Sequence, residues 1–499
     1  MGATQGSEGS FAVDSPGGSI EEGRNEKAFA IAPKSKCGRV LSQLCLLDEL
    51  ENPQRYSQAA KWVITSVVAV AGVAGPMGSA IFFPALSQVS DALDTSITTV
   101  NLCISVYMLS MAFCPLWWSA FSERFGRRKI YLLSFLLFIL SNVLGAHAKS
   151  IGVLIGMRLL SGAASSSGQT IGAGVIADVW EPKERGKAMG VFWLGPLCGP
   201  LISPIIGGAL SQEWNWRSIL WFLALYGAVT TLLILVALPE THTKRGNLDI
   251  KEPVKQPGLN LVKILLLDPL KTLRYLSRPP VLLTVYYASI TYCFLFMMNI
   301  SIENTFQKDP YRFSIIITGL LYIPNALGYI VASILGGRWM DYIMKREARK
   351  SERYDEDGGL IYHPEDRVRE NAWLAAFLYP AGLLWYGWTA DRGVAWPIPM
   401  VATFFFGLGS MIIFNMSTTM LTEFLPHKPS AGVAINNFVR NILGFVGTLA
   451  TVPIIEAIGN GWLFTIAGLL ALVSASVLWV MKVRGPRWRE SVDVRERSS

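Results

Sequence analysis

Residues 185–208 read RGKAMGVFWLGPLCGPLISPIIGG, an apolar run that is long enough to cross a bilayer yet rich in residues that weaken a helix. Small residues precede proline three times, four positions apart, so they form one narrow stripe on a helix. Each proline removes a backbone hydrogen bond, which neighbouring helices must offset in lipid. The pattern predicts a bent helix with close neighbours, which a bulky side chain would hold apart, although one Gly-Pro alone would indicate only a kinked packing helix. The positions that we assign to this seam are Gly195, Pro196, Gly199, Pro200, Pro204 and Gly207.

The composition is that of a membrane protein. Of the 499 residues, 51% are hydrophobic and only 16% are charged, and the mean hydropathy is +0.38. Twelve apolar runs are each long enough to cross about 30 Å of hydrocarbon. They cover residues 62–85, 98–121, 129–147, 151–177, 187–210, 217–239, 279–305, 312–336, 371–390, 396–421, 430–457 and 460–482. We therefore expect an all-α membrane protein with twelve transmembrane helices.

The distribution of charge predicts the orientation. Lys and Arg concentrate in every second loop, which places those loops and both termini in the cytoplasm. The net charge of +8 then reflects topology, and we expect no nucleic-acid partner. Residues 1–60 show no signal peptide, are rich in Gly, Ser and Glu, and predict a disordered cytoplasmic tail. An apolar patch at 41–50 either lies on the membrane, binds a partner or is simply part of that tail.

Two parts of the chain repeat one pattern. A basic turn, SAFSERFGRRK, occupies residues 119–129, and a degenerate copy, GRWMDYIMKR, occupies residues 337–346 at a matching offset. Copied loops predict a parallel repeat of two six-helix halves, with the substrate path between them. The expected organisation is a tail at 1–60, a half at 61–240, a cytoplasmic linker at 241–278, a half at 279–483 with a cytoplasmic loop at 337–370, and a tail at 484–499.

The seam and the basic turn carry a family resemblance. The seam resembles motif C of the major facilitator superfamily, which in that family marks proton-driven antiporters. The turn resembles motif A, although Ser119 and Glu123 stand where the family has Gly and Asp. The resemblance implies the major facilitator fold and a latch that favours the outward-open state, with Glu123 near a helix terminus of the other half and Arg127 paired with Asp178. The implied latch residues are Glu123, Gly126, Arg127, Arg128, Asp178 and Asp341.

One arginine lies deep in the fourth apolar run. At about 1.5 Å of rise per residue, Arg158 lies roughly 10 Å below the start of that run. A charge at such a depth normally faces the bundle interior, a partner or water. Arg158 and Gly162 resemble motif B, whose arginine the family associates with proton transfer; structural pairing is the alternative reading. Gln169 adds a further polar group to the same span.

The eleventh run carries a second polar group of residues. Asn437, Arg440 and Asn441 occupy positions i, i+3 and i+4, so they share one helix face that must point inward in lipid. The face serves either as hydrogen-bonding glue between helices or in substrate or proton binding. Candidate acidic partners are Glu303 and Glu456, near the outer ends of the seventh and eleventh runs, although both could instead be interfacial and solvated.

Residues 304–342 and 363–373 resemble fungal twelve-span drug:proton antiporters of the quinidine-resistance type. The resemblance implies a proton-coupled antiporter that exports small amphipathic molecules or drugs by alternating access. Organic acids, polyamines and secondary metabolites are alternative cargoes, because relatives of that group export them. Two deep arginines favour an anion among these. We expect a monomer in the plasma membrane, with the vacuole as the alternative, whose partners are the lipid bilayer and a small-molecule substrate.

Other functional classes fit the sequence less well. No G-x-x-x-x-G-K-[ST] motif occurs, so an ion gradient rather than ATP should drive transport, without a cofactor. The six cysteines and four histidines have no metal-ligand spacing, and no catalytic residue suggests itself, so we do not expect an enzyme. A channel or sensor stays open, but the repeat and the seam favour alternating access.

Overall fold

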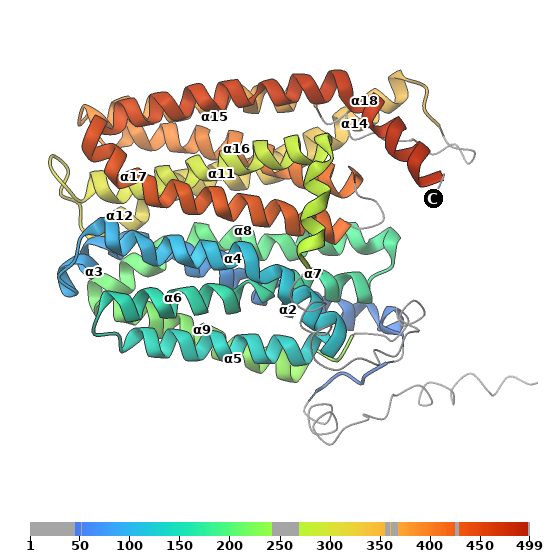
Figure 1. Ribbon diagram of the computed structural model, residues 1–499, viewed down its shortest axis with the longest axis horizontal. Helices are drawn as coiled ribbons and strands as arrows, with labels where there is room; N and C mark the ends of the chain where they lie inside the picture. The colour runs from blue at the N-terminus through green and yellow to red at the C-terminus, as the bar shows by residue number, and fades with distance from the viewer. Residues whose placement is uncertain are drawn as a thin grey trace, which may run out of the picture.

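The computed structural model describes residues 45–50, 52–241, 269–354, 360, 368–424 and 429–497. Long helices lie side by side along the longest axis of the molecule (Figure 1). Most of the expected N-terminal tail, residues 242–268 of the linker and residues 355–359 and 361–367 of the predicted cytoplasmic loop lie outside the described residues.

The first half, as defined by its helices, begins at Gln58 and ends at Ala237. Apolar sequence makes helix the natural state here, because a helix satisfies its own backbone hydrogen bonds in lipid. A short helix, α3 (Leu86–Ala92), follows a 3-10 turn, η2 (Phe83–Ala85), after the first span. The long helices are α2 (Gln58–Ala80), α4 (Ile97–Phe125), α5 (Arg127–Ala146), α6 (Ile151–Ser165), α7 (Ser167–Val179), α8 (Pro182–Glu213) and α9 (Arg217–Ala237).

The second half begins at Pro279, after the 3-10 segment η4 (Pro269–Ser277). A π-helical turn, η5 (Ala332–Gly336), joins α13 to α14 within the eighth span. Its helices are α11 (Pro279–Phe306), α12 (Ile315–Leu320), α13 (Ile323–Val331), α14 (Gly337–Lys350), α15 (Glu370–Asp391), α16 (Pro397–Phe424), α17 (Pro429–Ser474) and α18 (Ser476–Arg497).

The prediction of a twelve-helix, all-α membrane protein is confirmed. Eight helical segments of the described chain are long and apolar enough to cross a membrane, and the last of them, Ala434–Gly485, holds two spans. These two meet where Gly459 adopts a positive φ of 79° and the chain reverses. The other three spans are α6 with α7, α8, and α15.

The fourth span is interrupted at one residue, Ser166, which keeps helical dihedral angles (φ −64°, ψ −19°). It is predicted as one run at 151–177, yet α6 ends at Ser165 and α7 begins at Ser167. The hydroxyl groups of Ser165 and Ser166 donate to the carbonyl oxygens of Gly162 and Ala163 in the preceding turn. Such bonds compete with the helical ladder and bend a helix.

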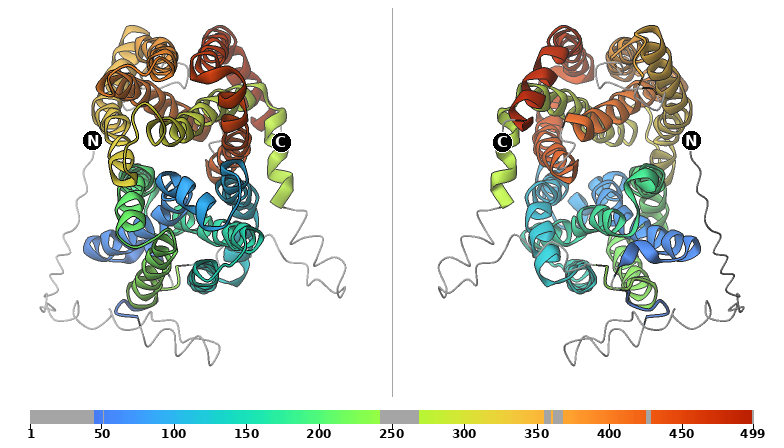
Figure 2. Two further views of the ribbon diagram at one scale, coloured as in Figure 1. Left: turned by 90° about the vertical axis from the view of Figure 1, so that its left-hand side faces the viewer. Right: turned by 90° about the vertical axis from the view of Figure 1, so that its right-hand side faces the viewer.

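The two halves lie against each other along the span axis. Figures 1 and 2 show α2 to α9 on one side and α11 to α18 on the other, with α4 and α8 next to the second half. We call the end that holds Gly126, Arg369 and Lys482 the basic end, and the end that holds α3 and the reversal at Gly459 the distal end.

Candidate functional site

The small-residue seam of α8 packs closely against α2. A Cβ at Gly199 would lie 3.0 Å from the backbone nitrogen of Met77 and 3.1 Å from Cβ of Pro76. A Cβ at Gly195 would overlap the carbonyl oxygen of Ala69. These contacts join two helices of the same half. The side chain of Pro200 lies outside the described residues.

The last turns of the seam also reach the second half, although Gly207 itself packs against Ile81 of the first half, whose carbonyl oxygen a Cβ would overlap. A Cβ at Gly208 would lie 3.0 Å from the carbonyl oxygen of Ile315 in α12. Conversely, a Cβ at Gly319 of α12 would lie 2.8 Å from the carbonyl oxygen of Pro204. Glycine at these positions therefore lets the two halves touch backbone to backbone at the distal end.

Polar side chains close the same end. Gln307 of α11 donates from Nε2 to the carbonyl oxygen of Pro84 at 2.9 Å and accepts from the hydroxyl of Ser87 at 2.5 Å. Nearby, Gln212 accepts from the backbone N–H of Ile316 at 2.9 Å. We call Pro84 and Ser87 of the first half, with Glu303 and Gln307 of the second, the distal clamp. The distal end is closed in this structure.

Glu303 is the ionisable group of the distal clamp. It lies one helical turn before Gln307 and its side chain is buried, at 1% exposure. The carboxylate lies beside the backbone of Ser87, and its Oε2 has no hydrogen-bond partner. Lys308 lies nearby, but its Nζ donates to Asn304. A carboxyl at a membrane-buried interface is costly and marks an ion or proton pathway.

The other acidic candidate has a different environment. Glu456 is exposed on α17, whereas Glu303 is buried between the halves. Neither forms an ion pair with Arg440 within the described part of the chain. The sequence places both acids near the distal end but contains no signal for which of them the fold buries.

Arg158 is fully buried in α6 and lies at the end of α2. Its Nη2 donates to the carbonyl oxygen of Gly78, and the guanidinium lies 4.5 Å from the ring centre of Phe82 and 4.3 Å from that of Tyr107. Gly78 is in the last turn of α2, where unpaired carbonyls carry partial negative charge. The backbone of α2 therefore replaces the acidic side chain that a buried arginine usually requires.

Tyr107 is a neighbour of Arg158 that the sequence did not reveal. Its hydroxyl contacts Oγ of Ser165 at 2.8 Å and donates to the carbonyl oxygen of Ala74 at 3.3 Å. A Cβ at Gly78 would overlap the same hydroxyl. Arg158 still has Nε and Nη1 without hydrogen-bond partners, so it retains donors for a proton-linked or anionic group.

A chain of amides links the halves farther toward the basic end. Nδ2 of Asn437 lies 3.5 Å from Oε1 of Gln169, which belongs to the first half. Oδ1 of Asn437 accepts from Nη2 of Arg440 at 3.0 Å, and that guanidinium lies 4.7 Å from the ring centre of Tyr292. Asn441 bonds back to the carbonyl oxygen of Asn437. The structure thus brings together four of the polar residues that we selected from sequence, and adds Tyr292.

At the basic turn, Arg127 lies beside Asp178. Nε of Arg127 is 3.1 Å from Oδ2 of Asp178, and Nη1 donates to the hydroxyl of Ser122 at 2.7 Å. The backbone N–H of Arg127 donates to Glu240 at 2.8 Å. Gly126 has a φ of 100°, and a Cβ there would collide with Glu240. Glycine is therefore required both for the backbone conformation and for the space beside Glu240. Sequence reasoning gave Glu240 no role at this turn.

Arg128 binds the segment that precedes the first span. Its Nη1 lies 3.7 Å from Oε1 of Glu49, and its Nη2 donates to the carbonyl oxygen of Leu235. Leu46 donates from its backbone to Val236 at 2.8 Å. The part of the apolar patch within residues 45–50 therefore packs on α9 of the same chain.

Glu123 does not reach the second half in this structure. Its side chain is exposed, and its hydrogen bond is to the hydroxyl of Ser119 on the same helix at 3.4 Å. The inter-half contact that the family resemblance implies for Glu123 is therefore not made in this distally closed conformation. The side chain of Asp341 lies outside the described residues.

We expect the Arg127 and Asp178 pair to show energetic coupling. Arg127→Gln and Asp178→Asn each leave a partly buried charge without its partner, at a cost of about 1–3 kcal/mol. The double variant should therefore lose little more than the worse single one. Thermal unfolding of the detergent-solubilised protein measures this, and losses that simply add would exclude a coupled pair.

Comparison with known proteins agrees with this geometry. The family model described as Major Facilitator Superfamily matches residues 68–448. The chain belongs to the major facilitator superfamily. The solved structure of a D-xylose-proton symporter has the same fold, with a TM-score of 0.64 at 13% sequence identity, covering 84% of this chain and 97% of that one.

Fungal relatives within the superfamily carry drug-resistance names. The chain is 32% identical to the MFS antiporter QDR3 of Candida albicans, covering 91% of this chain and 82% of that protein. It is 28% identical to quinidine resistance protein 3 of Saccharomyces cerevisiae, covering 93% and 88%. Citrate exporter 1 of Aspergillus niger is 29% identical, covering 87% and 88%. The chain is therefore a multi-pass transporter of the fungal drug-resistance group and not an enzyme.

Proposed function

We propose that this transporter is a proton-coupled antiporter that exports small amphipathic molecules or drugs by alternating access. The observation that carries the proposal is the burial of Glu303 in the distal clamp, at the contact between the two halves. The two relatives with drug-resistance names support the cargo class. Transport by this scheme needs no cofactor other than the proton gradient.

The clamp suggests how a proton would couple to the motion of the halves. When the distal end opens, the carboxylate of Glu303 leaves its contact with Ser87 and meets water. Proton binding there removes the charge, which lowers the cost of returning the group to an apolar interface. Closure would then favour the protonated carrier. Release of the proton toward the basic end would restore the charge and favour reopening, and cargo export would occur on that return step.

The orientation is part of the same proposal. We place the basic end in the cytoplasm, because it carries the basic turn with Arg127 and Arg128 and the cationic residues Arg369 and Lys482. The structure would then represent an inward-facing state of the transport cycle, with the distal end closed to the outside. We propose the plasma membrane as the location, with the vacuole as the alternative.

Aromatic rings near Arg440 fit a flat apolar cargo. Tyr292 packs 4.8 Å from Phe296 and 6.1 Å from Phe414 between ring centres. Phe113 of the first half meets Phe438 of the second at 5.0 Å. Ring faces of this kind bind amphipathic molecules without demanding one fixed pattern of polar groups.

Organic-anion export is the second candidate. In the part of the chain that the structure describes, neither Arg158 nor Arg440 forms an ion pair with a carboxylate, and each has an unpartnered Nε. A weakly screened buried cation favours an anionic guest. The similarity to a citrate exporter points the same way.

Purified protein in sealed vesicles tests the proposal directly. An imposed proton gradient should drive uphill movement of a cationic or neutral drug, and collapsing the gradient should stop it. A channel could not produce uphill movement. Uphill movement of carboxylates alone would favour the second candidate, and gradient-independent leakage of every cargo would exclude both.

Arg440→Gln distinguishes the two cargo classes. Because Arg440 belongs to the amide chain that links the halves, we expect export of carboxylates and of neutral drugs to fall equally, by about tenfold, the effect of a barrier change of 1.4 kcal/mol. Collapse of carboxylate export alone would favour anion transport. Arg349→Gln supplies the matched control, because Arg349 is exposed. If Arg440→Gln reduced the export of neither cargo, Arg440 would not belong to the site.

A further inference from the structure

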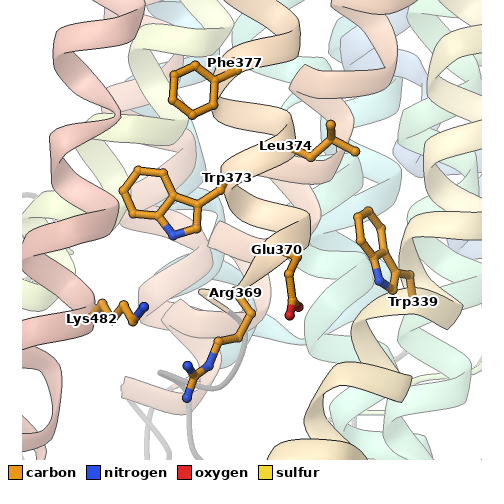
Figure 3. Close-up of a pocket in the computed structure, with 7 residues that line it drawn as sticks. All are labelled: Trp339, Arg369, Glu370, Trp373, Leu374, Phe377 and Lys482. Atoms are coloured by element: carbon orange, nitrogen blue, oxygen red, sulfur yellow. The ribbon is translucent and has the colours of Figure 1, made fainter.

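A groove lies at the basic end of the second half, away from the contact between the halves. It has a volume of about 620 Å³ and is bounded by α14, α15 and α18 (Figure 3). The residues that line it are Trp339, Arg369, Glu370, Trp373, Leu374, Phe377 and Lys482. The groove belongs to the outer surface of the bundle, so it is separate from the transport path proposed above.

The groove is apolar toward the middle of the bundle. Trp373, Leu374 and Phe377 occupy neighbouring positions on α15; Leu374 lies on the side of Trp339 of α14, and the rings of Trp373 and Phe377 lie on the side of Lys482 (Figure 3). Leu374 is 47% exposed and Phe377 is 61% exposed, so neither is covered by protein. Tryptophan at the level where a span leaves the membrane is typical of the membrane interface.

The other end of the groove is charged. Figure 3 shows Arg369, Glu370 and Lys482 grouped below Trp373, with Phe377 at the opposite end. The charged residues thus lie at the basic end of the groove and the aromatic rings lie deeper, which is the order of headgroup and acyl chains in a bilayer leaflet.

The charges of this end do not cancel. Glu370 forms an ion pair with Arg346 at 2.9 Å, which holds the pKa of Glu370 below its usual value. Arg369 pairs with the partly buried Glu347 at 2.9 Å. Lys482 is exposed and forms no ion pair within the described residues. One positive charge is therefore left without a counterion beside the apolar wall.

We propose that this groove binds an anionic phospholipid from the leaflet at the basic end. Its phosphate would bind Lys482 and the guanidinium of Arg369, while an acyl chain would lie along Trp373, Leu374 and Phe377. Basic pockets between transmembrane helices select acidic headgroups in this way, and each Lys or Arg contributes about fivefold in affinity. The inference requires only a membrane-spanning bundle, so it does not depend on the cargo or on proton coupling.

Lipid binding by the purified full-length protein tests the site without any transport measurement. Native mass spectrometry would compare retention of dioleoylphosphatidylserine with that of dioleoylphosphatidylcholine. The wild-type protein should retain the anionic lipid preferentially. Lys482→Gln should weaken that binding about fivefold, and Lys482→Glu should weaken it by more than tenfold. Lys482 is exposed, so neither change should disturb folding, which size-exclusion chromatography verifies.

Lys350→Gln is the matched control, since Lys350 is exposed on α14 at the same end but does not line the groove. Phe377→Ala should weaken retention of the lipid, because it removes part of the acyl wall. Equal retention of the two lipids, or equal losses for Lys350→Gln and Lys482→Gln, would overturn the proposal. Competition by soluble glycerophosphoserine as effective as by the lipid would instead identify a phosphate site and overturn the lipid assignment.

Discussion

Gly208→Leu should lower export at least tenfold while the protein still reaches the membrane in normal amount. A Cβ at Gly208 would already lie 3.0 Å from the carbonyl oxygen of Ile315, so a leucine side chain cannot fit while the distal end is closed. Overpacking costs about 1–3 kcal/mol, and 1.4 kcal/mol corresponds to a factor of ten in rate. The cost falls on one conformation of the cycle, so the carrier should become trapped with its distal end open.

The same helix supplies the control. A Cβ at Gly190 of α8 would meet no atom of the described chain within 4 Å, so Gly190→Leu should leave export unchanged. Spin labels on Glu213 and Asp309, exposed distal residues of the two halves, should move apart in Gly208→Leu and not in Gly190→Leu. Wild-type export together with an unchanged label distance would show that the halves do not separate at this seam.

Gly199→Leu should lower the stability of the protein as well as its export rate, unlike Gly208→Leu. Gly199 contacts Pro76 and Met77 within its own half, so the overpacking persists in every conformation. We therefore expect lower thermal stability as well as lower export.

Glu303→Gln should abolish proton-driven accumulation, with at least a tenfold loss. Glutamine keeps the size of the side chain and can still pack beside Ser87, so the distal clamp should close. It cannot exchange a proton, so the export rate should lose its dependence on external pH. Exchange of labelled for unlabelled drug, which requires no net proton movement, should continue.

Glu456→Gln is the matched control for the same chemical change, because Glu456 is an exposed acid at the distal end of α17. It should retain both uphill export and its pH dependence. Uphill, pH-dependent export by Glu303→Gln at the wild-type rate would remove Glu303 from the coupling mechanism. Equal losses in both variants would point to general sensitivity of the distal surface to charge.

Much of the fold follows from the sequence. Lipid admits few backbone conformations, so an apolar run of sufficient length becomes a helix, and the predicted spans agree with the observed helices to within a few residues at most ends. The basic turn and the seam were likewise visible, because their glycines are needed locally: Gly126 for its φ of 100°, and Gly195 for the approach of Ala69. The one-residue interruption at Ser166 was not visible, because serine hydroxyls bond to the backbone in intact helices as well.

The location of each span and the depth of each polar residue within it could thus be predicted from the sequence, since a helix rises by about 1.5 Å per residue whatever surrounds it. Arg158 was placed deep in its span on that basis alone. Its partner, the carbonyl oxygen of Gly78 at the end of α2, emerged only when the helices were assembled. The same holds for the burial of Glu303 against Ser87, the exposure of Glu456, and the division of one glycine seam between α2 and α12. Depth is a property of one helix, whereas rotation about the helix axis and the choice of neighbour depend on side chains contributed by distant parts of the chain.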